Sequence, residues 1–312
     1  MENIIEIRQL VKKYKEHEAV KGIDLDIKEG EIFGLLGPNG AGKTTTISMI
    51  VGILKISSGS IKIFGKDINK ESAEIKKNIG YVPQDLAFFE TMNAYDNVTY
   101  WGRLYGLSGK NLKKSVQEAL EYTGLWDRRK DKASSYSGGM KRRLNIACAI
   151  VHKPKLLFMD EPTVGVDPQS RNSVLESIKE LNKNGTTVVY TSHYMEEVEA
   201  ICDRVAIMDF GKVIALGTID ELIADIVKDE CVALEIDAID AKVYNDIKSM
   251  DGVIRCEKEG SLINVHVDPN VLTTIKLIED LIAQKLDIKA INVEKSNLES
   301  VFLSLTGKKL RD

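Results

Sequence analysis

The chain has little cysteine and no long apolar run. Its 312 residues include only four cysteines, which are scattered and form no C-x-x-C pair or metal-ligand spacing. We therefore expect them to be reduced and to have no catalytic role: Cys148, Cys202, Cys231 and Cys256. No apolar stretch approaches the ~18 residues that a membrane-spanning helix needs, and Met1 to Lys12 alternates instead of forming a signal peptide.

An excess of positive charge is also absent. The formal net charge is -4, the pI is near 5.8, and no basic stripe stands out, so there is no electrostatic case for binding nucleic acid. The composition, 43% hydrophobic and 29% charged over 312 residues, is enough for two domains with cores of their own.

The most informative segment that is present is a glycine-rich loop. Gly37 to Thr44 reads G-P-N-G-A-G-K-T, follows the apolar run Ile32 to Leu36, and precedes a helix-like stretch, Thr45 to Ile53. This order predicts a phosphate-binding loop, because glycines let backbone N–H groups close around phosphate oxygens at a helix start. Lys43 can then reach the β- and γ-phosphates, and the Thr44 hydroxyl can hold Mg²⁺. A plain glycine turn is the alternative. The predicted nucleotide contacts are Gly37, Pro38, Asn39, Gly40, Ala41, Gly42, Lys43, Thr44 and Thr45.

A second candidate is an apolar run that ends in two carboxylates. Leu156 to Glu161 reads L-L-F-M-D-E. A buried carboxylate without a partner is costly, so a strand with this end indicates a use for the charge. Asp160 suits a Mg²⁺ shell, and Glu161 can accept a proton from an attacking water. A strand end that merely reaches solvent is the alternative.

A third candidate is the S-G-G segment, Ser137, Gly138 and Gly139, which precedes the helix-like stretch Leu144 to Val151. Serine and glycines at a helix start leave N–H groups free for a second anion. On its own, an ordinary helix N-cap is the better interpretation.

Taken in order, these segments resemble the ATP-binding cassette (ABC) family of ATPases over residues 1 to about 220. The family's set is a phosphate loop, a glutamine loop, an S-G-G signature, a D-E strand end, an aspartate loop and a switch histidine. The corresponding residues are Gly37 to Thr44, Gln84 in Y-V-P-Q, Ser137 to Gly139, Asp160 with Glu161, Asp167 in V-G-V-D-P, and His193 in T-S-H. Tyr136 departs from the leucine that is usual before the signature.

The resemblance implies further roles. Tyr14 matches the aromatic that stacks on adenine, with a core tyrosine as the alternative. Gln84 matches the residue that senses Mg²⁺ and the attacking water, with a solvent-facing loop glutamine as the alternative. Asp167 belongs to the nucleotide site, and His193 matches the γ-phosphate contact, so Glu161, His193, Gln84 and Lys43 form the expected catalytic set. Three histidines lack such a setting and are interpreted as surface or core residues: His17, His152 and His266.

The resemblance also implies partners. Two chains pair head to tail around ATP, with Ser137 and Gly139 of one facing Lys43, Glu161 and His193 of the other. The pore lies on a separate multi-spanning permease, which places this chain at the cytoplasmic face of the membrane. The expected permease contact is an aromatic-rich stretch, although many of these residues also suit a helical core: Phe88, Phe89, Tyr95, Tyr100, Trp101 and Tyr105.

The predicted fold is α/β, an ABC-type nucleotide-binding domain over residues 1–228. Its mixed central sheet contains parallel strands at 32–36, 156–159 and 187–191, with an antiparallel edge at 5–11, 19–27 and 61–64. A helical insert covers about 85–135, and 110–123 has the clearest helical period.

Residues 229–312 are predicted to form a small α+β accessory domain. Strands at 231–237, 253–257, 262–267 and 288–293 and helices at 241–250 and 271–285 give a βαββαβ order, which predicts a ferredoxin-like unit. A closing helix, 297–306, resembles the tail of drug-, lipid- and polysaccharide-type exporter ATPases. We favour a role for this domain in steadying the dimer or gripping the permease over ligand sensing.

The predicted function is the ATP-hydrolysing motor of an exporter, with ATP and Mg²⁺ as cofactors. The alternative is a cassette ATPase that acts in translation or DNA maintenance. Those relatives usually carry a duplicated cassette or a long coiled coil, and this sequence shows neither.

Overall fold

The computed structural model describes residues 2–226, 230–236, 241–269, 271–283, 288–294 and 297–306. It divides into two compact units, one up to Thr218 and one from Ile219 onward. None of the helices in these described ranges is long and apolar enough to cross a membrane.

The first unit is built on a six-stranded mixed sheet with the order β10-β9-β3-β8-β7-β6. The strands are β3 (Ile32–Leu36), β6 (Ile79–Val82), β7 (Leu156–Asp160), β8 (Thr187–Thr191), β9 (Arg204–Asp209) and β10 (Lys212–Gly217). All neighbours are parallel except β9 and β10. Every residue of β3, β7 and β8 is buried, which is why these strands appear as largely apolar runs in the sequence. The predicted mixed sheet is thus confirmed.

A second, antiparallel sheet has the order β2-β1-β4-β5. Its strands are β1 (Asn3–Tyr14), β2 (His17–Lys28), β4 (Ser58–Ile63) and β5 (Lys66–Asp67). The sequence places these strands at an edge of the central sheet, whereas the structure gives them a sheet of their own. The physical reason is packing: one face of this sheet is buried in a common core with central-sheet residues such as Phe33 and Phe158, so the sheet covers the central sheet instead of extending it.

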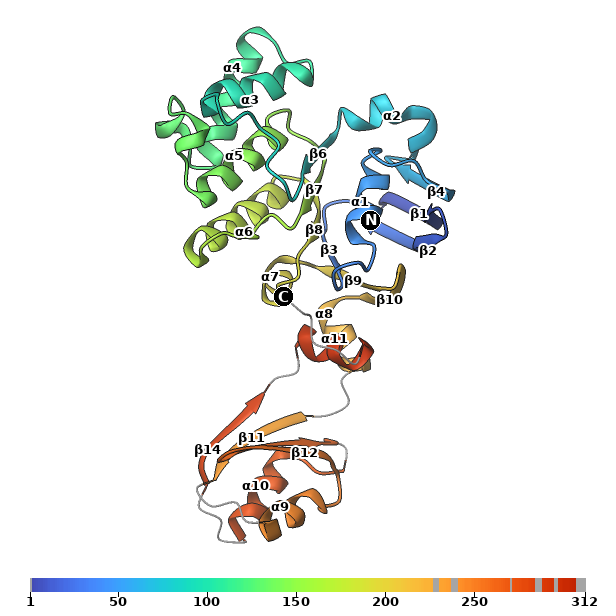
Figure 1. Ribbon diagram of the computed structural model, residues 1–312, viewed down its shortest axis with the longest axis vertical. Coiled ribbons are helices and arrows are strands. Elements are labelled where there is room, and N and C mark those ends of the chain that lie inside the picture. Colours follow the sequence, from blue (N-terminus) through green and yellow to red (C-terminus); the bar gives the residue numbers. More distant parts are fainter. Residues whose placement is uncertain are drawn as a thin grey trace. The chain divides into compact units, whose positions relative to one another are not determined.

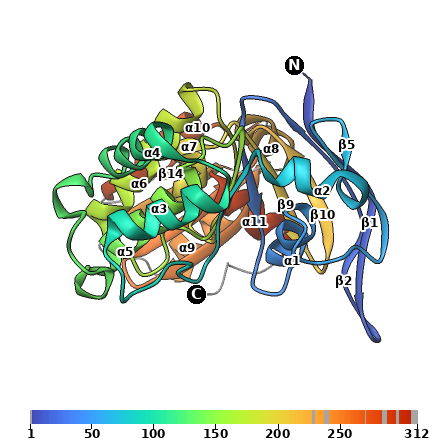
Figure 2. The same ribbon diagram turned by 90° about the horizontal axis from the view of Figure 1, so that it is seen from above.

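Helices surround the central sheet. They are α1 (Lys43–Ile50), α2 (Ile68–Lys76), α3 (Ala94–Leu104), α4 (Gly109–Tyr122), α5 (Gly138–Ile150), α6 (Pro168–Lys183) and α7 (Met195–Ile201), with short 3-10 turns at Trp126–Arg128 and Ala133–Ser135. Figures 1 and 2 show α3 and α4 on one side of the central strands and the β1–β2 sheet on the other. The four residues predicted to form the apolar face of α4 are all buried: Leu112, Val116, Ala119 and Leu120.

The second unit contains a four-stranded antiparallel sheet with the order β12-β13-β11-β14. Its elements are α8 (Ile219–Ile226), β11 (Glu230–Ile236), α9 (Ala241–Lys248), β12 (Val253–Glu259), β13 (Leu262–Val267), α10 (Thr274–Ala283), β14 (Ile288–Glu294) and α11 (Leu298–Thr306). The βαββαβ order agrees with the expectation, and the apolar core includes Val232, Ile263 and Leu281. The predicted ends at Asp237 and Lys285 lie outside the described residues. Helix α8, which the sequence did not predict, packs against α11.

One histidine is built into the packing of the first unit. The His152 ring stacks on Tyr105 with 3.5 Å between the ring centroids, and its Nε2 lies 3.0 Å from the carbonyl oxygen of Ile79. Burial lowers the pKa of His152 to about 4. A histidine that is held neutral in the folded chain but takes up a proton when unfolded makes folding depend on pH.

We expect His152 to contribute about 3 kcal/mol to a fall in the free energy of unfolding as the pH drops from 6.5 to 4. In that window the unfolded chain binds a proton that the folded chain does not. His152→Gln, which keeps an N–H donor but cannot titrate, flattens this dependence in urea unfolding measured across the range. His17→Gln, at the exposed β1–β2 turn, is the control for the substitution itself.

Candidate functional site

The site lies where four neighbouring parallel strands end. Strands β3, β8, β7 and β6 are adjacent in the sheet, and each is followed by one of the motifs seen in the sequence. The carboxyl ends of parallel strands meet at one edge, which is where α/β sheets bind ligands. Segments that are far apart in the sequence are brought together for this reason.

The glycine-rich loop after β3 depends on backbone space. Gly37 has φ 151°, and a Cβ there would lie 2.3 Å from the carbonyl oxygen of Met208. Gly42 has φ 102° and precedes α1 with no side chain capping the helix. The first N–H groups of α1 are therefore available to an anion at the positive end of the helix dipole.

Lys43 spans this loop. Its side chain is 5% exposed, and its Nζ donates to the carbonyl oxygen of Gly37 at 2.7 Å. Burial lowers the pKa of Lys43, while Glu161 and Asp160 act in the opposite direction. A cation held in this position can stabilise charge on phosphate oxygens without a large rearrangement.

Asp160, at the end of β7, is 1% exposed. Its Oδ1 accepts hydrogen bonds from Thr191 Oγ1 at 2.8 Å and from Thr44 Oγ1 at 3.4 Å. Its Oδ2 is buried and has no hydrogen-bond partner among the described residues. A buried carboxylate oxygen of this kind, beside a threonine hydroxyl, is the donor chemistry that a hard divalent cation prefers.

Glu161 is the residue on which the other motifs converge. Gln84 Nε2 donates to its Oε2 at 3.1 Å, and His193 Nδ1 lies 3.6 Å from the same oxygen. The backbone of Glu161 is left-handed, with φ 49°, a conformation that costs a non-glycine residue roughly 1–3 kcal/mol. Its N–H is held by Thr191, by the carbonyl oxygen at 3.2 Å and the hydroxyl at 2.9 Å. This contact keeps the carboxylate aimed at Gln84 and His193.

The loop that carries Gln84 is fixed by two residues that the sequence did not single out. Arg142, on α5, donates to the carbonyl oxygens of Pro83 at 3.2 Å and Gln84 at 2.9 Å. Asn145, three residues later, accepts from the N–H of Ala87 at 2.9 Å. The sequence did carry a signal for them: both are polar, they lie on one face of a helix, and the residues around them are buried. Thr191, the last residue of the buried strand β8, is a third site residue that the sequence did not single out.

Other predicted site residues lie elsewhere. Ser137 caps α5 by accepting from Met140 N at 3.3 Å, so it does serve as a helix N-cap. A Cβ on Gly139 would lie 2.7 Å from Ser170 Oγ, which places the signature against the start of α6, where Asp167 is the N-cap. Within the described residues, no hydrogen bond or ion pair joins this signature segment to the glycine-rich loop. Tyr14, at the end of β1, is 45% exposed, so it is not a core tyrosine.

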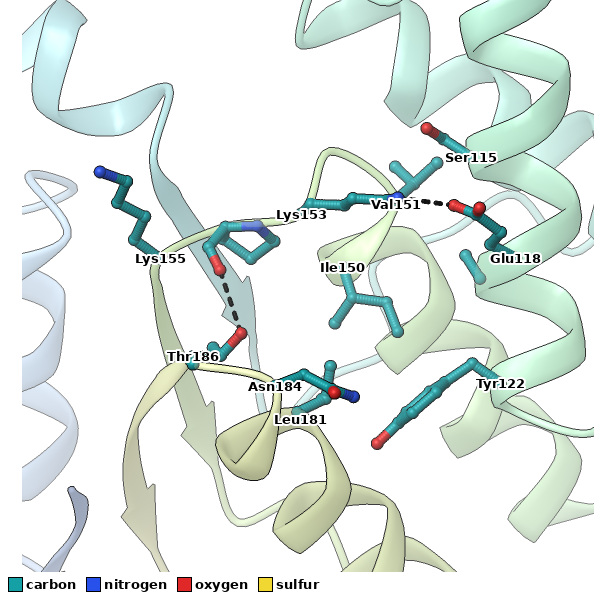
Figure 3. Close-up of a pocket in the computed structure, with 13 residues that line it drawn as sticks. Ser115, Glu118, Tyr122, Ile150, Val151, Lys153, Lys155, Leu181, Asn184 and Thr186 are labelled. Carbon is teal, nitrogen blue, oxygen red and sulfur yellow. Dashed lines mark hydrogen bonds and ion pairs between the residues drawn. The ribbon is translucent and has the colours of Figure 1, made fainter. Parts of the chain in front are cut away.

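A cavity of about 390 Å³ lies apart from these residues. Figure 3 shows its apolar lining by Ile150, Leu181 and Tyr122, together with the Lys153–Glu118 ion pair, 2.7 Å between Nζ and Oε2. Two other lining residues, Lys155 and Thr186, directly precede β7 and β8. The cavity is therefore at the amino-terminal edge of these strands, opposite to the edge that carries Asp160.

The chain is similar to known proteins over nearly its whole length. The family model described as ABC transporter matches residues 20–164. The linearmycin resistance ATP-binding protein LnrL of Bacillus subtilis is 45% identical over 311 residues, which cover 99% of this chain and 100% of the relative. The daunorubicin/doxorubicin resistance ATP-binding protein DrrA of Streptomyces peucetius is 35% identical and covers 97% and 92%. The Nod factor export ATP-binding protein I of Cupriavidus metallidurans is 34% identical over the full length of both.

Solved structures are similar to a large part of the chain. CbiO1 of Clostridium perfringens, part of an ABC transporter complex, has a TM-score of 0.67 at 33% identity and covers 72% of this chain and 92% of its own. The cassette MJ0796, solved as a dimer in a post-hydrolysis state with ADP and Pi, has a TM-score of 0.64 at 27% identity and covers 69% and 98%. The chain therefore belongs to the ABC transporter family, as an ATP-hydrolysing ATP-binding protein of the exporter type.

Proposed function

We propose that Glu161 is the general base of ATP hydrolysis and that Gln84, His193 and Lys43 complete the catalytic set. The observation that supports this is the convergence of Gln84 and His193 on one oxygen of Glu161. A carboxylate held in this way can take a proton from water. Lys43 and a donor on His193 would stabilise charge on the transferring phosphoryl group.

Magnesium fits the same site. Asp160, with a buried oxygen that lacks a partner among the described residues, together with the Thr44 hydroxyl and the Gln84 amide, would hold Mg²⁺. When bound, the ion supplies charge neutralisation for the phosphates. Thr191, which donates to the other oxygen of Asp160, orients that carboxylate.

We further propose that two chains pair head to tail around ATP. Gly139 lies against Ser170 at the start of α6, and among the described residues no hydrogen bond or ion pair joins Ser137, Gly138 or Gly139 to the glycine-rich loop. A signature presented in this way, with Asp167 beside it, is free to cover nucleotide on a second copy, and Tyr14 is exposed for stacking on the base. The similar cassette MJ0796 forms a dimer.

The permease contact is proposed for the segment that follows Gln84. Four large apolar side chains are substantially exposed there: Leu86 (40%), Phe89 (44%), Met92 (39%) and Tyr100 (41%). Beside them is a cavity of about 270 Å³, lined by residues that include Ala87, Trp101 and Tyr105. An apolar surface next to a hollow suits an inserted helix of a membrane partner. Two other predicted aromatic residues, Phe88 and Tyr95, are partly buried.

This segment, Leu86 to Tyr100, is called the docking segment below, and backbone hydrogen bonds join it to Ala133 and Ser134, just before the signature. The carbonyl oxygens of Glu90 and Met92 accept from Ser134 N at 3.0 Å and Ala133 N at 2.9 Å. Lys141 Nζ, on α5, pairs with Glu90 Oε1 at 2.6 Å. The buried Asn97 side chain also accepts from Phe89 N at 2.8 Å.

The two predicted domains have separate roles in this proposal. Residues 1–228, with a helical insert at about 85–135, act as the nucleotide-binding domain at the cytoplasmic face of a membrane. Residues 229–312 act as a ferredoxin-like accessory domain that steadies the dimer or grips the permease. Two relatives are named for resistance to antibiotics, which supports an antibiotic or similar organic compound as the exported cargo.

Glu161→Gln should lower the hydrolysis rate of the full-length protein by about 10²–10⁴-fold while leaving ATP binding intact, since it removes only the base. Phosphate release and binding of a fluorescent ATP analogue measure the two effects. Glu176→Gln, an exposed glutamate on α6 that pairs only locally with Lys179, is the control. Hydrolysis at the wild-type rate in the first variant would remove Glu161 from this role.

Tagged Glu161→Gln protein, pulled from detergent-solubilised native membranes with ATP and Mg²⁺, should retain a second copy of the chain and a multi-spanning membrane protein. ATP that is not hydrolysed keeps the pair closed. The same pull-down without nucleotide is the control for ATP dependence. Recovery of ribosomes or DNA instead would support the alternative class of cassette ATPase.

Phe89→Ala should leave ATP hydrolysis by the purified chain unchanged but reduce its stimulation by, or recovery with, the permease. The side chain is exposed, so its loss changes the docking surface more than the core. Phe210→Ala, at a 71% exposed phenylalanine in the β9–β10 turn, is the matched control. Normal coupling in the Phe89 variant contradicts the proposed contact.

A further inference from the structure

A buried carboxylate outside the proposed catalytic set connects several parts of the site. Glu197, on α7, is 2% exposed. Its Oε2 accepts hydrogen bonds from three hydroxyls, those of Thr163 at 2.8 Å, Tyr190 at 2.7 Å and Ser192 at 2.8 Å. Arg171 Nε, on α6, lies 3.2 Å from its other oxygen, Oε1.

These four partners come from three segments. Thr163 is two residues after Glu161, on the loop that leads to Asp167. Tyr190 is in β8, just before its last residue, Thr191. Ser192 follows the strand directly and precedes His193. Arg171 is in the first turns of α6. One carboxylate therefore ties the segment after the proposed base, the segment of the proposed switch histidine and the helix that begins at the aspartate loop.

The contacts continue from Glu197 to the imidazole of His193. Ser192 Oγ, which donates to Glu197, also accepts from Tyr194 N at 2.9 Å, so the backbone is held on both sides of His193. The Arg171 guanidinium lies 4.4 Å from the centre of the Tyr194 ring. The Tyr194 ring is in turn 4.2 Å from the His193 ring.

The charge of Glu197 is needed for this arrangement. An ionised carboxylate only accepts hydrogen bonds, so it can receive three hydroxyls on one oxygen and face a cation with the other. A glutamine amide in the same place would turn a donor either toward Arg171 or toward the hydroxyls. Burial also raises the pKa of Tyr190, with the charge of Glu197 acting in the same direction, so the Tyr190 hydroxyl stays a donor.

We propose that Glu197 is a positioning residue for ATP hydrolysis. It holds His193 beside Glu161 by fixing the loop after Glu161 and the backbone on both sides of His193. This rests on the proposed role of His193. Glu197 touches neither nucleotide nor water in this scheme; it acts through His193 and through the loop that Thr163 shares with Glu161.

The test is a double-mutant cycle on the full-length chain. Glu197→Gln should lower kcat about 10-fold or more while the KM for ATP stays within about 2-fold, because binding through the glycine-rich loop is untouched. Glu196→Gln is the matched control, since Glu196 is the preceding residue on α7 but is exposed; it should keep wild-type kcat. In a His193→Ala background, Glu197→Gln should cause little further loss, because both changes remove the same contribution.

The outcomes separate the inference from the role on which it rests. If His193→Ala hydrolyses ATP at the wild-type rate, the role of His193 fails, and the inference fails with it. Glu197 does not act through His193 if His193→Ala is slow but Glu197→Gln keeps wild-type kcat. The same conclusion follows if Glu197→Gln lowers kcat by the same factor in the His193→Ala background as it does in the wild-type chain. Should Glu197→Gln not fold, as judged by circular dichroism, Arg171→Gln and Tyr194→Ala test the same connection from its more accessible end. Wild-type kcat in both of those variants overturns the proposal.

Discussion

The constraint on which the first unit depends is the burial of charge at one edge of a parallel sheet. Lys43, Arg142, Asp160, Glu161 and Glu197 are each at most 8% exposed. An isolated charge in such a place costs several kcal/mol, so each must be paired or hydrogen-bonded, and each is. Their hydrogen-bond partners are threonine and tyrosine hydroxyls, amides and carbonyl groups of the neighbouring segments. The left-handed backbone of Glu161 lies among these groups, with its N–H held by Thr191.

Much of this could be predicted from the sequence because parallel strands leave a clear pattern. A fully buried strand is an unbroken apolar run, and polar residues directly after it must lie at its carboxyl end. The positions of Asp160 and Glu161 follow from this rule, and the position of Lys43 follows from the phosphate-loop motif after β3. The resemblance to the family, based on the order of the motifs, predicted Gln84 and His193 at the same edge. The structure places both beside Glu161.

The sequence could not predict which side of a short element faces inward. Glu196 and Glu197 are adjacent identical residues on a helix of only seven residues, too short for periodicity to separate the buried one from the exposed one. Arg142 belongs to a K-R-R run that is usually solvated. The strands β1, β2 and β4 have a correct alternating pattern, but alternation says only that one face is covered, not which sheet the strand joins. Helix α8 is eight residues long and lies beside a change of unit, where local signals are weak.

The backbone bonds of Glu90 and Met92 with Ser134 and Ala133 tie the apolar docking segment to the turn that leads into Ser137, the serine that caps α5. If the permease docks there as proposed, its movement would reach the signature through backbone contacts. The cargo takes no part in that path, which suits a fold whose relatives are named for chemically unlike compounds.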